Sequence, residues 1–471
     1  MNVILRSAEE TPMKLPKRIS VFITCFYITL YLIVALTLVF TQPFGDPPDE
    51  FNRFLIPQYI AEHGTLPNGY EESIRINGYG FSYAFQPILP YMAQGYAMRV
   101  VRLFSDSESA MVLTGRLVDC LFGLLTAIVI VKLSKLWFKD DRFAWIFAFM
   151  ATFLPQSIFI HTYINTDSCC MLSIAVMLFA LTAGLQNGFE RNTNILLSVG
   201  IILCALSYYN AYGYILSCIL LFTASFLHKE KKLRFDWKPF LKKGLFISCL
   251  VLAGIAWWFI RSAILYDGDF LGLRVRQECA MLYAEPAYHP LTRETWQNLG
   301  YSPLDMLGKS DFINLSILSF IAMYSHMAIP APIWLYRFYK YFLLLSLLLC
   351  ATVSTKKLVQ REGEDVIRSK PLRIFYYCNL IGCILIPILL SIVYSYTTDY
   401  QPQGRYLLPS LIPLIFYSIH GIEKTWKSSI CNKFRNDKLL NVITILLITV
   451  IVGLLLWMIF GVVLPYYGYL R

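Results

Sequence analysis

Charged residues are scarce in this sequence: Asp, Glu, Lys and Arg make up 15% of its 471 positions. Soluble globular domains carry about a quarter, so this composition excludes a soluble globular class. Hydrophobic residues reach 57%, the mean hydropathy is +0.54, and many apolar runs approach the roughly 20 residues that cross a bilayer. The sequence therefore predicts an all-α, polytopic membrane protein.

Several signatures of cofactor and metal chemistry are also missing. The 12 cysteines form no CxxC pair and no paired spacing, which speaks against a zinc site or a disulfide framework. The six histidines lack metal-ligand spacing, and no Gly-rich phosphate loop of the Walker or Rossmann kind is present. We predict no metal and no cofactor. The net charge of +11 comes without a compact basic face interleaved with aromatics, so nucleic-acid binding is not expected either.

The apolar runs predict a single transmembrane domain over 1–471 with about eleven spans. Four basic residues precede the first run and no small-residue cleavage site follows it, so we expect a retained first span and a cytoplasmic N-terminus. The spans are predicted at about 19–41, 112–136, 142–162, 168–186, 193–206, 208–227, 243–265, 333–354, 372–396, 406–423 and 438–463.

The distribution of positive charge favours this arrangement. Most of the 41 Lys and Arg residues fall on short segments that would face the cytoplasm, as the positive-inside rule expects. A rival arrangement makes 84–104 a span and fuses 195–226 into one long helix. We prefer the first, because the polar and turn residues of 207–213 interrupt that long run.

Two long segments are predicted on the outer side. The first outer loop, 42–111, includes the apolar stretch 84–104, which also carries Gln, Pro and Arg and is interpreted as helices lying in the membrane interface. The second, 266–332, is rich in Tyr and in apolar residues. We expect it to form a folded lid over the outer end of the bundle.

Three carboxylates open the first outer loop. Asp46 is predicted to cap a helix that runs to about His63, with Asp49 and Glu50 in its first turn. The simpler interpretation is that these acids only cap the helix and offset its dipole. Their position beside the membrane surface favours a further, chemical role.

Three other polar groups are expected on the outer side. Asn165 and Asp167 lie between two spans, and Asp167 could equally be a helix N-cap. Gln403, Arg405 and Tyr406 belong to the stretch QGRY at the start of a late span, where Arg405 could instead be an anchor that snorkels to the interface. Arg116 lies inside the opening turn of a span, where a charge is costly and usually paired or functional.

These groups together suggest one kind of chemistry. A positioned carboxylate can deprotonate a hydroxyl, and arginine at the membrane surface can hold a lipid-linked phosphate with paired donors. A base and a phosphate clamp at the same membrane surface are what a transferase acting on lipid-phosphate sugars needs.

The order of motifs resembles that of the GT-C glycosyltransferases. The motifs are PPDE after the first span, QPILPY, FLPQSIFIHTYINTD and a late QGRYLLP. They are most similar to those of a bacterial branch of multi-pass proteins that is related to protein O-mannosyltransferases and the aminoarabinose transferase. The resemblance implies a GT-C-like fold and an inverting transfer of a single sugar from a polyprenyl-phosphate carrier. It places that transfer on the outer face of a bacterial cytoplasmic membrane, with a glycan, lipid or protein hydroxyl as the acceptor.

The resemblance also implies roles for particular residues. Asp49 would be the catalytic base, with Glu50 as the second choice, and Arg405 would grip the carrier phosphate. Relatives place an acid in the second outer loop, where this chain has Asp167. One departure is Arg53, where the branch often has a His; Arg53 could assist the phosphate instead. The substrate-binding set expected from motifs and resemblance comprises Asp46, Arg53, Arg116, Asn165, Asp167, Gln403, Arg405 and Tyr406.

Two other functions stay open at this point. A transporter or flippase of lipid-linked glycans would need charged or broken helices at mid-membrane depth, whereas the polar groups here gather near the predicted outer ends. A polymerase or ligase of surface glycans would share the long outer segment and would transfer a whole chain. The sequence does not identify the sugar, the acceptor or the oligomeric state.

Overall fold

The computed structural model describes residues 13–229, 233–352, 369–427 and 436–469. The first twelve residues, the last two, and much of the predicted cytoplasmic segments around 356–368 and 428–435 lie outside the described residues. The described chain is helical almost throughout, with two short antiparallel hairpins, β1 (Leu227–Lys229) with β2 (Leu233–Phe235) and β3 (Met323–Tyr324) with β4 (Ile329–Pro330). The predicted all-α class is confirmed.

The helices follow in this order along the chain. The first half contains α1 (Lys17–Thr41), α2 (Glu50–His63), η1 (Glu72–Ile74), η2 (Tyr83–Phe85), α3 (Leu89–Val101), α4 (Glu108–Trp137), α5 (Asp141–Phe153), α6 (Pro155–Phe159), α7 (Asp167–Asn187), α8 (Arg191–Ala205), η3 (Tyr209–Ala211) and α9 (Tyr212–Ala224). The second half contains α10 (Trp237–Leu265), α11 (Leu273–Tyr283), α12 (Pro303–Lys309), α13 (Phe312–Ile321), α14 (Ile333–Thr352), α16 (Lys370–Thr397), η4 (Gly404–Ser410), α17 (Leu411–Trp426), α18 (Asp437–Leu456), η6 (Trp457–Val463) and α19 (Leu464–Tyr469).

Seven helices in the described chain are long and apolar enough to cross a membrane. They are α1, α4, α7, α10, α14, α16 and the continuous helix Asp437–Gly468. The spans expected at 142–162, 193–206, 208–227 and 406–423 correspond to shorter helices, so the number eleven stays a prediction. The first of these is broken between α5 and α6, because Pro155 has no N–H and disfavours a helical conformation at Leu154.

The rival helix pattern is wrong. The stretch 195–226 is not one helix, since a turn and η3 separate α8 from α9, and 84–104 contains the end of η2 followed by the 13-residue helix α3. The backbone N–H of Leu89 donates to the carbonyl of Leu206 at 3.1 Å, so the turn between α8 and α9 lies against the start of α3. The side of the membrane on which this turn lies stays a prediction.

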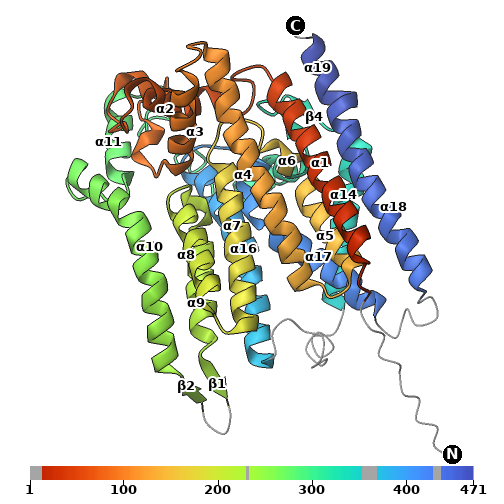
Figure 1. Ribbon diagram of the computed structural model, residues 1–471. Coiled ribbons are helices and arrows are strands. Elements are labelled where there is room, and N and C mark those ends of the chain that lie inside the picture. Colours follow the sequence, from red (N-terminus) through yellow and green to blue (C-terminus); the bar gives the residue numbers. More distant parts are fainter. Residues whose placement is uncertain (1–12, 230–232, 353–368, 428–435, 470–471) are drawn as a thin grey trace, which may run out of the picture.

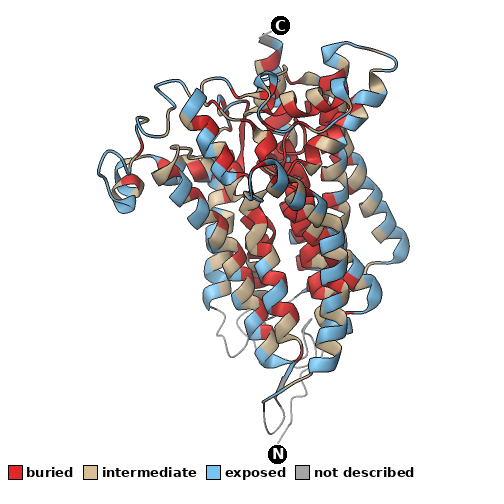
Figure 2. Cartoon of the chain, turned by 90° about the vertical axis from the view of Figure 1, so that its left-hand side faces the viewer, coloured by how far each residue is buried: buried red, intermediate tan, exposed pale blue. Residues whose placement is uncertain are grey.

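The two ends of the bundle are built differently (Figure 1). One end carries the start of α1 and the β1–β2 hairpin, and the opposite end carries α2, α3 and α11. We call the latter the site end. Buried residues gather toward the site end and the bundle centre, while the outward faces of the long helices are exposed (Figure 2). Outward apolar faces are expected of helices surrounded by lipid.

Close backbone contacts fix the late chain at the site end. A Cβ on Gly404 would lie 1.9 Å from the backbone nitrogen of Phe320, so α13 crosses the start of η4 at a distance that only glycine permits. The N–H of Gly404 also donates to Ser319 Oγ at 2.7 Å. These backbone contacts fix the position of Arg405, the residue that follows Gly404.

Candidate active site

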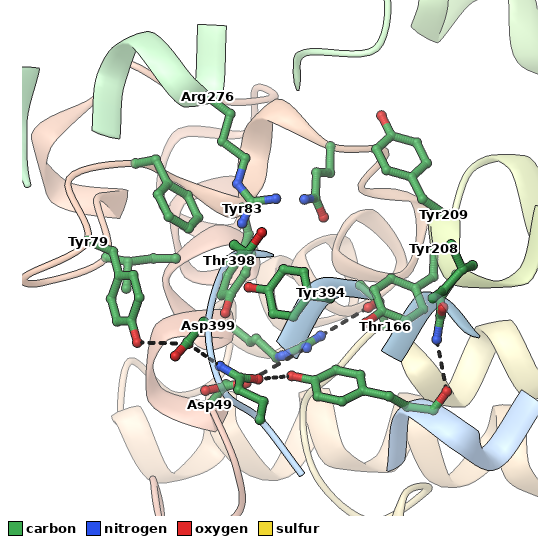
Figure 3. Close-up of a pocket in the computed structure, with 18 of the residues that line it drawn as sticks. Asp49, Tyr79, Tyr83, Thr166, Tyr208, Tyr209, Arg276, Tyr394, Thr398 and Asp399 are labelled. Carbon is green, nitrogen blue, oxygen red and sulfur yellow. Dashed lines mark hydrogen bonds and ion pairs between the residues drawn. The ribbon is translucent and has the colours of Figure 1, made fainter. Parts of the chain in front are cut away.

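A cavity of about 430 Å³ lies at the site end. Its walls come from seven separate parts of the chain: the start of α2, the loop 76–87, Tyr91 on α3, Thr166 before α7, the turn between α8 and α9, α11, and the segment from the end of α16 to Tyr406. Figure 3 shows the side chains that converge on it, among them Asp49, Tyr83, Arg276, Tyr394 and Asp399. The folding of distant segments onto one another creates this site.

The Asp49 side chain lines the cavity, and its backbone conformation is strained. Its φ of 61° lies in the left-handed region, which non-glycine residues rarely adopt, and the helix α2 starts directly after it at Glu50. The predicted cap at Asp46 is therefore wrong. The Asp46 carboxylate instead accepts hydrogen bonds from Ser325 Oγ at 2.7 Å and from the Tyr467 hydroxyl at 2.9 Å, so it ties the turn after α1 to two later segments.

Asp49 and Arg405 form an ion pair although 356 positions separate them along the chain. Arg405 is buried, and its guanidinium also donates to the Pro48 carbonyl at 3.2 Å and to the Tyr406 hydroxyl at 3.0 Å. Arg53 lies one helical turn after Asp49, with 4.0 Å between Nη2 and the carboxylate. Asp49 and Arg53 line the cavity, whereas the buried Arg405 contacts Asp49 and is not part of the cavity wall. We call the part of the wall that Asp49 and Arg53 form the cavity floor.

The charges around Asp49 set its protonation state. Burial raises the pKa of the Asp49 carboxyl, but the positive charges of Arg405 and Arg53 and the hydrogen bond from Arg405 outweigh burial and hold that pKa below its usual value. Asp49 is consequently ionised at neutral pH. About a third of its side chain is exposed, which leaves it accessible from the cavity.

Glu50, the adjacent acid, has a different environment. Its side chain is completely buried and accepts from Arg116 at 2.6 and 2.7 Å, and from the backbone N–H groups of Gly45 at 3.1 Å and Ile164 at 3.2 Å. Arg116 also donates to three backbone carbonyls at the end of α1, those of Val39, Gln42 and Pro43. This pair joins α1, α2 and α4, and neither residue lines the cavity.

Arg53 connects the cavity floor to the start of α7. Its Nη1 donates to Thr166 Oγ1 at 3.0 Å and lies 3.8 Å from the buried carboxylate of Asp167. Asp167 is the first residue of α7, whose N-cap is Thr166. Asp167 Oδ2 has no hydrogen-bond partner within the described part of the chain, so its contact with Arg53 is electrostatic.

Six of the eight expected substrate-binding residues do not line the cavity: Asp46, Arg116, Asn165, Asp167, Gln403 and Arg405. Asn165 is buried and donates to the carbonyls of Ile160 and Tyr163, and its side-chain oxygen accepts from the Ser168 N–H, so it shapes the turn before α7. Gln403 accepts from the Tyr406 N–H through its backbone carbonyl. Neither side chain lines the cavity, in contrast to Tyr406.

Sequence reasoning missed Asp399, although it lies inside the stretch TTDYQPQGRY. Its carboxylate lines the cavity and accepts from Gln401 Nε2 at 2.6 Å and from the Tyr79 hydroxyl at 3.4 Å. Gln401 Oε1 in turn accepts from the Tyr406 hydroxyl, which itself accepts from Arg405. A chain of hydrogen bonds therefore links Asp399 to the Asp49–Arg405 pair, and the alternation of polar residues in this stretch could have indicated it.

Arg276 was also missed, and no local signal marks it. It lies on α11 within the long segment 266–332, and only the docking of that segment brings it to the cavity. As for metals, the described residues contain no group of three or more His, Cys, Asp or Glu side chains that could hold an ion.

Residues 57–415 match a family model described as "Predicted membrane protein (DUF2142)". The chain belongs to this family. The matched range includes Asp167, Arg276 and Arg405 and begins eight residues after Asp49. A comparison of the DUF2142 chain with curated proteins finds no match.

Solved structures similar to this DUF2142 chain include the oligosaccharyltransferase of Archaeoglobus fulgidus. One structure, tethered to an acceptor peptide, has a TM-score of 0.52 at 14% identity and covers 93% of this chain and 55% of its own. Another, named AglB and complexed with an inhibitory peptide and a dolichol-phosphate, has a TM-score of 0.50 at 12% identity and covers 93% and 56%. ArnT from Cupriavidus metallidurans bound to undecaprenyl phosphate has a TM-score of 0.45 at 13% identity and covers 86% and 60%.

The chain thus spans about half the length of the archaeal structures that it matches. Identities this low establish a shared fold and nothing finer. The expected GT-C-like multi-pass membrane fold is confirmed.

Proposed function

We propose that this chain is an inverting glycosyltransferase that moves a single sugar from a polyprenyl-phosphate carrier to an acceptor hydroxyl. The observation that carries the proposal is the contact between Asp49 and Arg405 at one cavity in a chain of GT-C-like fold. An ionised carboxylate and a guanidinium at the same cavity supply the two groups that such a transfer needs, a base and a phosphate ligand.

In the proposed reaction the acceptor hydroxyl attacks the anomeric carbon of the sugar while Asp49 takes its proton. The bond between that carbon and the carrier phosphate oxygen breaks on the opposite face, so the configuration inverts. The phosphate leaves with the bonding electron pair, and Arg405 and Arg53 stabilise the charge that develops on it. Because the lowered pKa of Asp49 makes it a weak base, its proton transfer accompanies the attack and does not precede it.

The carrier is part of the proposal. One of the similar archaeal structures contains a dolichol-phosphate, which is a polyprenyl phosphate. In the present chain Arg405 already binds Asp49, so an incoming phosphate competes with that carboxylate for the guanidinium. Phosphate binding would then loosen Asp49 from its partner and leave it closer to its ordinary basicity. The carrier would thereby activate the base that acts on it.

The surrounding residues take positioning roles in this proposal. Glu50 is fully bonded by Arg116 and two backbone donors, so we assign the pair Glu50–Arg116 to holding the strained turn of Asp49 and give Glu50 no part in proton transfer. Asp46 fixes the same turn from its other side. Asp167 orients Arg53 toward the cavity floor.

Other residues line or support the proposed substrate site. Tyr406 bonds both Arg405 and Gln401 and faces the cavity directly. Asn165 and Gln403 act through the backbone turns that they fix. We further propose that the cavity opens to the outer face of a bacterial cytoplasmic membrane, where a glycan, lipid or protein supplies the acceptor hydroxyl.

The test removes the charge of the proposed base and keeps the size of its side chain. Asp49→Asn keeps the side-chain size and removes the charge, so sugar transfer from polyprenyl-phosphate-linked donors in membranes should fall by roughly 10² to 10⁴. Asp106→Asn is the matched control, since Asp106 is an exposed aspartate at the same end, paired only with Arg102. The control should keep full activity.

Unchanged transfer by the Asp49→Asn variant would remove Asp49 from the role of base. Product analysis of the same reactions separates the alternatives: a single added residue supports this proposal, and ligation of a whole chain supports a polymerase or ligase. Donor scrambling in vesicles that survives the Asp49→Asn change, without any transfer product, would favour a transporter.

A further inference from the structure

Arg276 brings a second positive charge to the cavity, from a wall that the proposed reaction does not use. It projects from α11 into the cavity, above Tyr83 and Tyr394 in the view of Figure 3. Its guanidinium carbon lies 4.2 Å from the centre of the Phe81 ring, so the side chain is held against an aromatic face. It is partly buried.

The wall that carries Arg276 is packed tightly onto the early loop. A Cβ on Gly272 would lie 2.1 Å from the Phe85 carbonyl oxygen, and one on Gly80 would lie 2.4 Å from the Ala284 nitrogen. Both glycines have positive φ. The Glu285 N–H also donates to the Gly78 carbonyl at 2.9 Å. These contacts fix the segment that carries Arg276 against the early loop.

The charge balance separates Arg276 from Arg405 and Arg53. Arg405 pairs with Asp49, and Arg53 lies within 4.0 Å of both Asp49 and Asp167. Arg276 has no carboxylate partner within ion-pair distance in the described part of the chain; its guanidinium contacts the Phe81 ring and the Tyr394 side chain.

Asp399, the other carboxylate on this wall, does not neutralise Arg276. It accepts from Gln401 and Tyr79. Arg276 is partly buried on the cavity wall, so its guanidinium charge remains available to an anionic ligand.

We propose that Arg276 binds an anionic group, a carboxylate or a phosphate, carried by the acceptor. The assignment to the acceptor rests on the proposed function, since the donor phosphate is there assigned to Arg405 and Arg53 at the floor. The cavity is large enough for more than one sugar residue at about 430 Å³. The preferred acceptors are consequently acidic glycans or phosphorylated saccharides, and neutral saccharides bind less well.

The experiment measures binding, without turnover, to the full chain in lipid nanodiscs by ligand-observed NMR titration. The probes are methyl β-glucoside, methyl β-glucuronide and methyl β-glucoside 6-phosphate, which differ only in the group at carbon 6 and in its charge. A charge-assisted contact should make at least one of the charged probes bind about tenfold more tightly than the neutral one. The better of the two charged probes identifies the anion.

Three variants test whether Arg276 causes this preference. Arg276→Gln should abolish it, and Arg276→Lys should keep a reduced preference, which shows that the site still folds. Arg274→Gln is the matched control, because Arg274 lies on the same helix, is exposed and pairs with Glu278 at 3.5 Å. The control should bind all three probes as the unaltered chain does.

A further arm separates the acceptor from the donor. Affinity for undecaprenyl phosphate should be unchanged in Arg276→Gln. The inference is overturned by equal affinity for charged and neutral probes, by no binding of any probe, by a preference that survives Arg276→Gln, or by weaker undecaprenyl phosphate binding in that variant. Failure of the proposed function is a separate result, because it shows as unimpaired transfer by Asp49→Asn.

Discussion

The two neighbouring acids Asp49 and Glu50 each pair with an arginine from a distant helix or turn, and the two pairs differ in nearly everything else. Glu50 has no exposed surface and four donors around it, and its partner Arg116 is saturated by backbone carbonyls. Asp49 is one-third exposed, lies in a strained conformation and faces a cavity.

The difference shows which ion pair builds the scaffold and which remains available for chemistry. A buried pair whose hydrogen bonds are all satisfied resists opening, since either partner alone would be an uncompensated charge. A pair in which one partner, Asp49, is one-third exposed opens more readily when a competing ion arrives. Neighbouring positions with the same chemistry can therefore serve opposite purposes, and the environment decides which.

The largest expected effect is on stability. Glu50→Gln leaves Arg116 buried without its counter-charge, so the free energy of unfolding should fall by about 3–5 kcal/mol. Unfolding followed in mixed micelles measures this loss. If the variant unfolds like the unaltered chain but no longer transfers sugar, Glu50 belongs to the reaction and the comparison of the two pairs fails.

Arg405→Gln should show the reverse pattern. Loss of the charge that stabilises the leaving phosphate should lower sugar transfer by roughly 10²–10³, while stability should fall less than in Glu50→Gln because the partner Asp49 is partly solvated. Arg405→Lys should be intermediate, since lysine keeps the charge and loses the paired donors. Transfer rates and unfolding measured on the same samples check both halves, and a variant that is unstable yet active would contradict the assignment.

The pH dependence of transfer should report the same pair. Burial raises the pKa of Asp49, but Arg405 and Arg53 hold it below its usual value, so kcat/KM should stay level through the ordinary range of aspartate pKa values and fall only at lower pH. In Arg405→Gln the positive charge that lowers the pKa of Asp49 is gone, while burial, which raises that pKa, remains. The acid limb of the residual activity in Arg405→Gln should therefore shift to higher pH. An unshifted limb would show that another group titrates.

Asp399→Asn should have the smallest effect. The asparagine can still accept from Gln401, so the hydrogen-bond chain to Arg405 weakens without breaking. We expect a change of a few fold in kcat and no change in stability. Steady-state kinetics of the variant measure this, and a loss as large as that of Asp49→Asn would make Asp399 an equal participant.

Much of the fold followed from composition and apolar periodicity. The membrane class, the end of α2 at His63 and the break between α8 and α9 were all predicted, because long apolar runs, a C-terminal Gly64 and polar turn residues act locally. The start of α2 was not predicted. The distant partners of Asp46 and Glu50 contribute to that start, and no local pattern reveals partners that lie 279 and 66 positions away.

The candidate site divides in the same way. Asp49, Arg53, Arg405 and Tyr406 were found because they lie in compact motifs beside predicted spans. Arg276 was not, because it becomes part of the cavity only when its segment docks on the loop that contains Gly80. The number of spans also stays open, since four of the predicted spans correspond to shorter helices and Pro155 breaks one of them.

The most direct measurement compares undecaprenyl phosphate binding by the unaltered chain and by Asp49→Asn. If Asp49 and the carrier phosphate compete for Arg405, removing the carboxylate charge should tighten phosphate binding several-fold while sugar transfer is lost. Binding that is unchanged or weaker in Asp49→Asn would contradict a shared site for base and carrier.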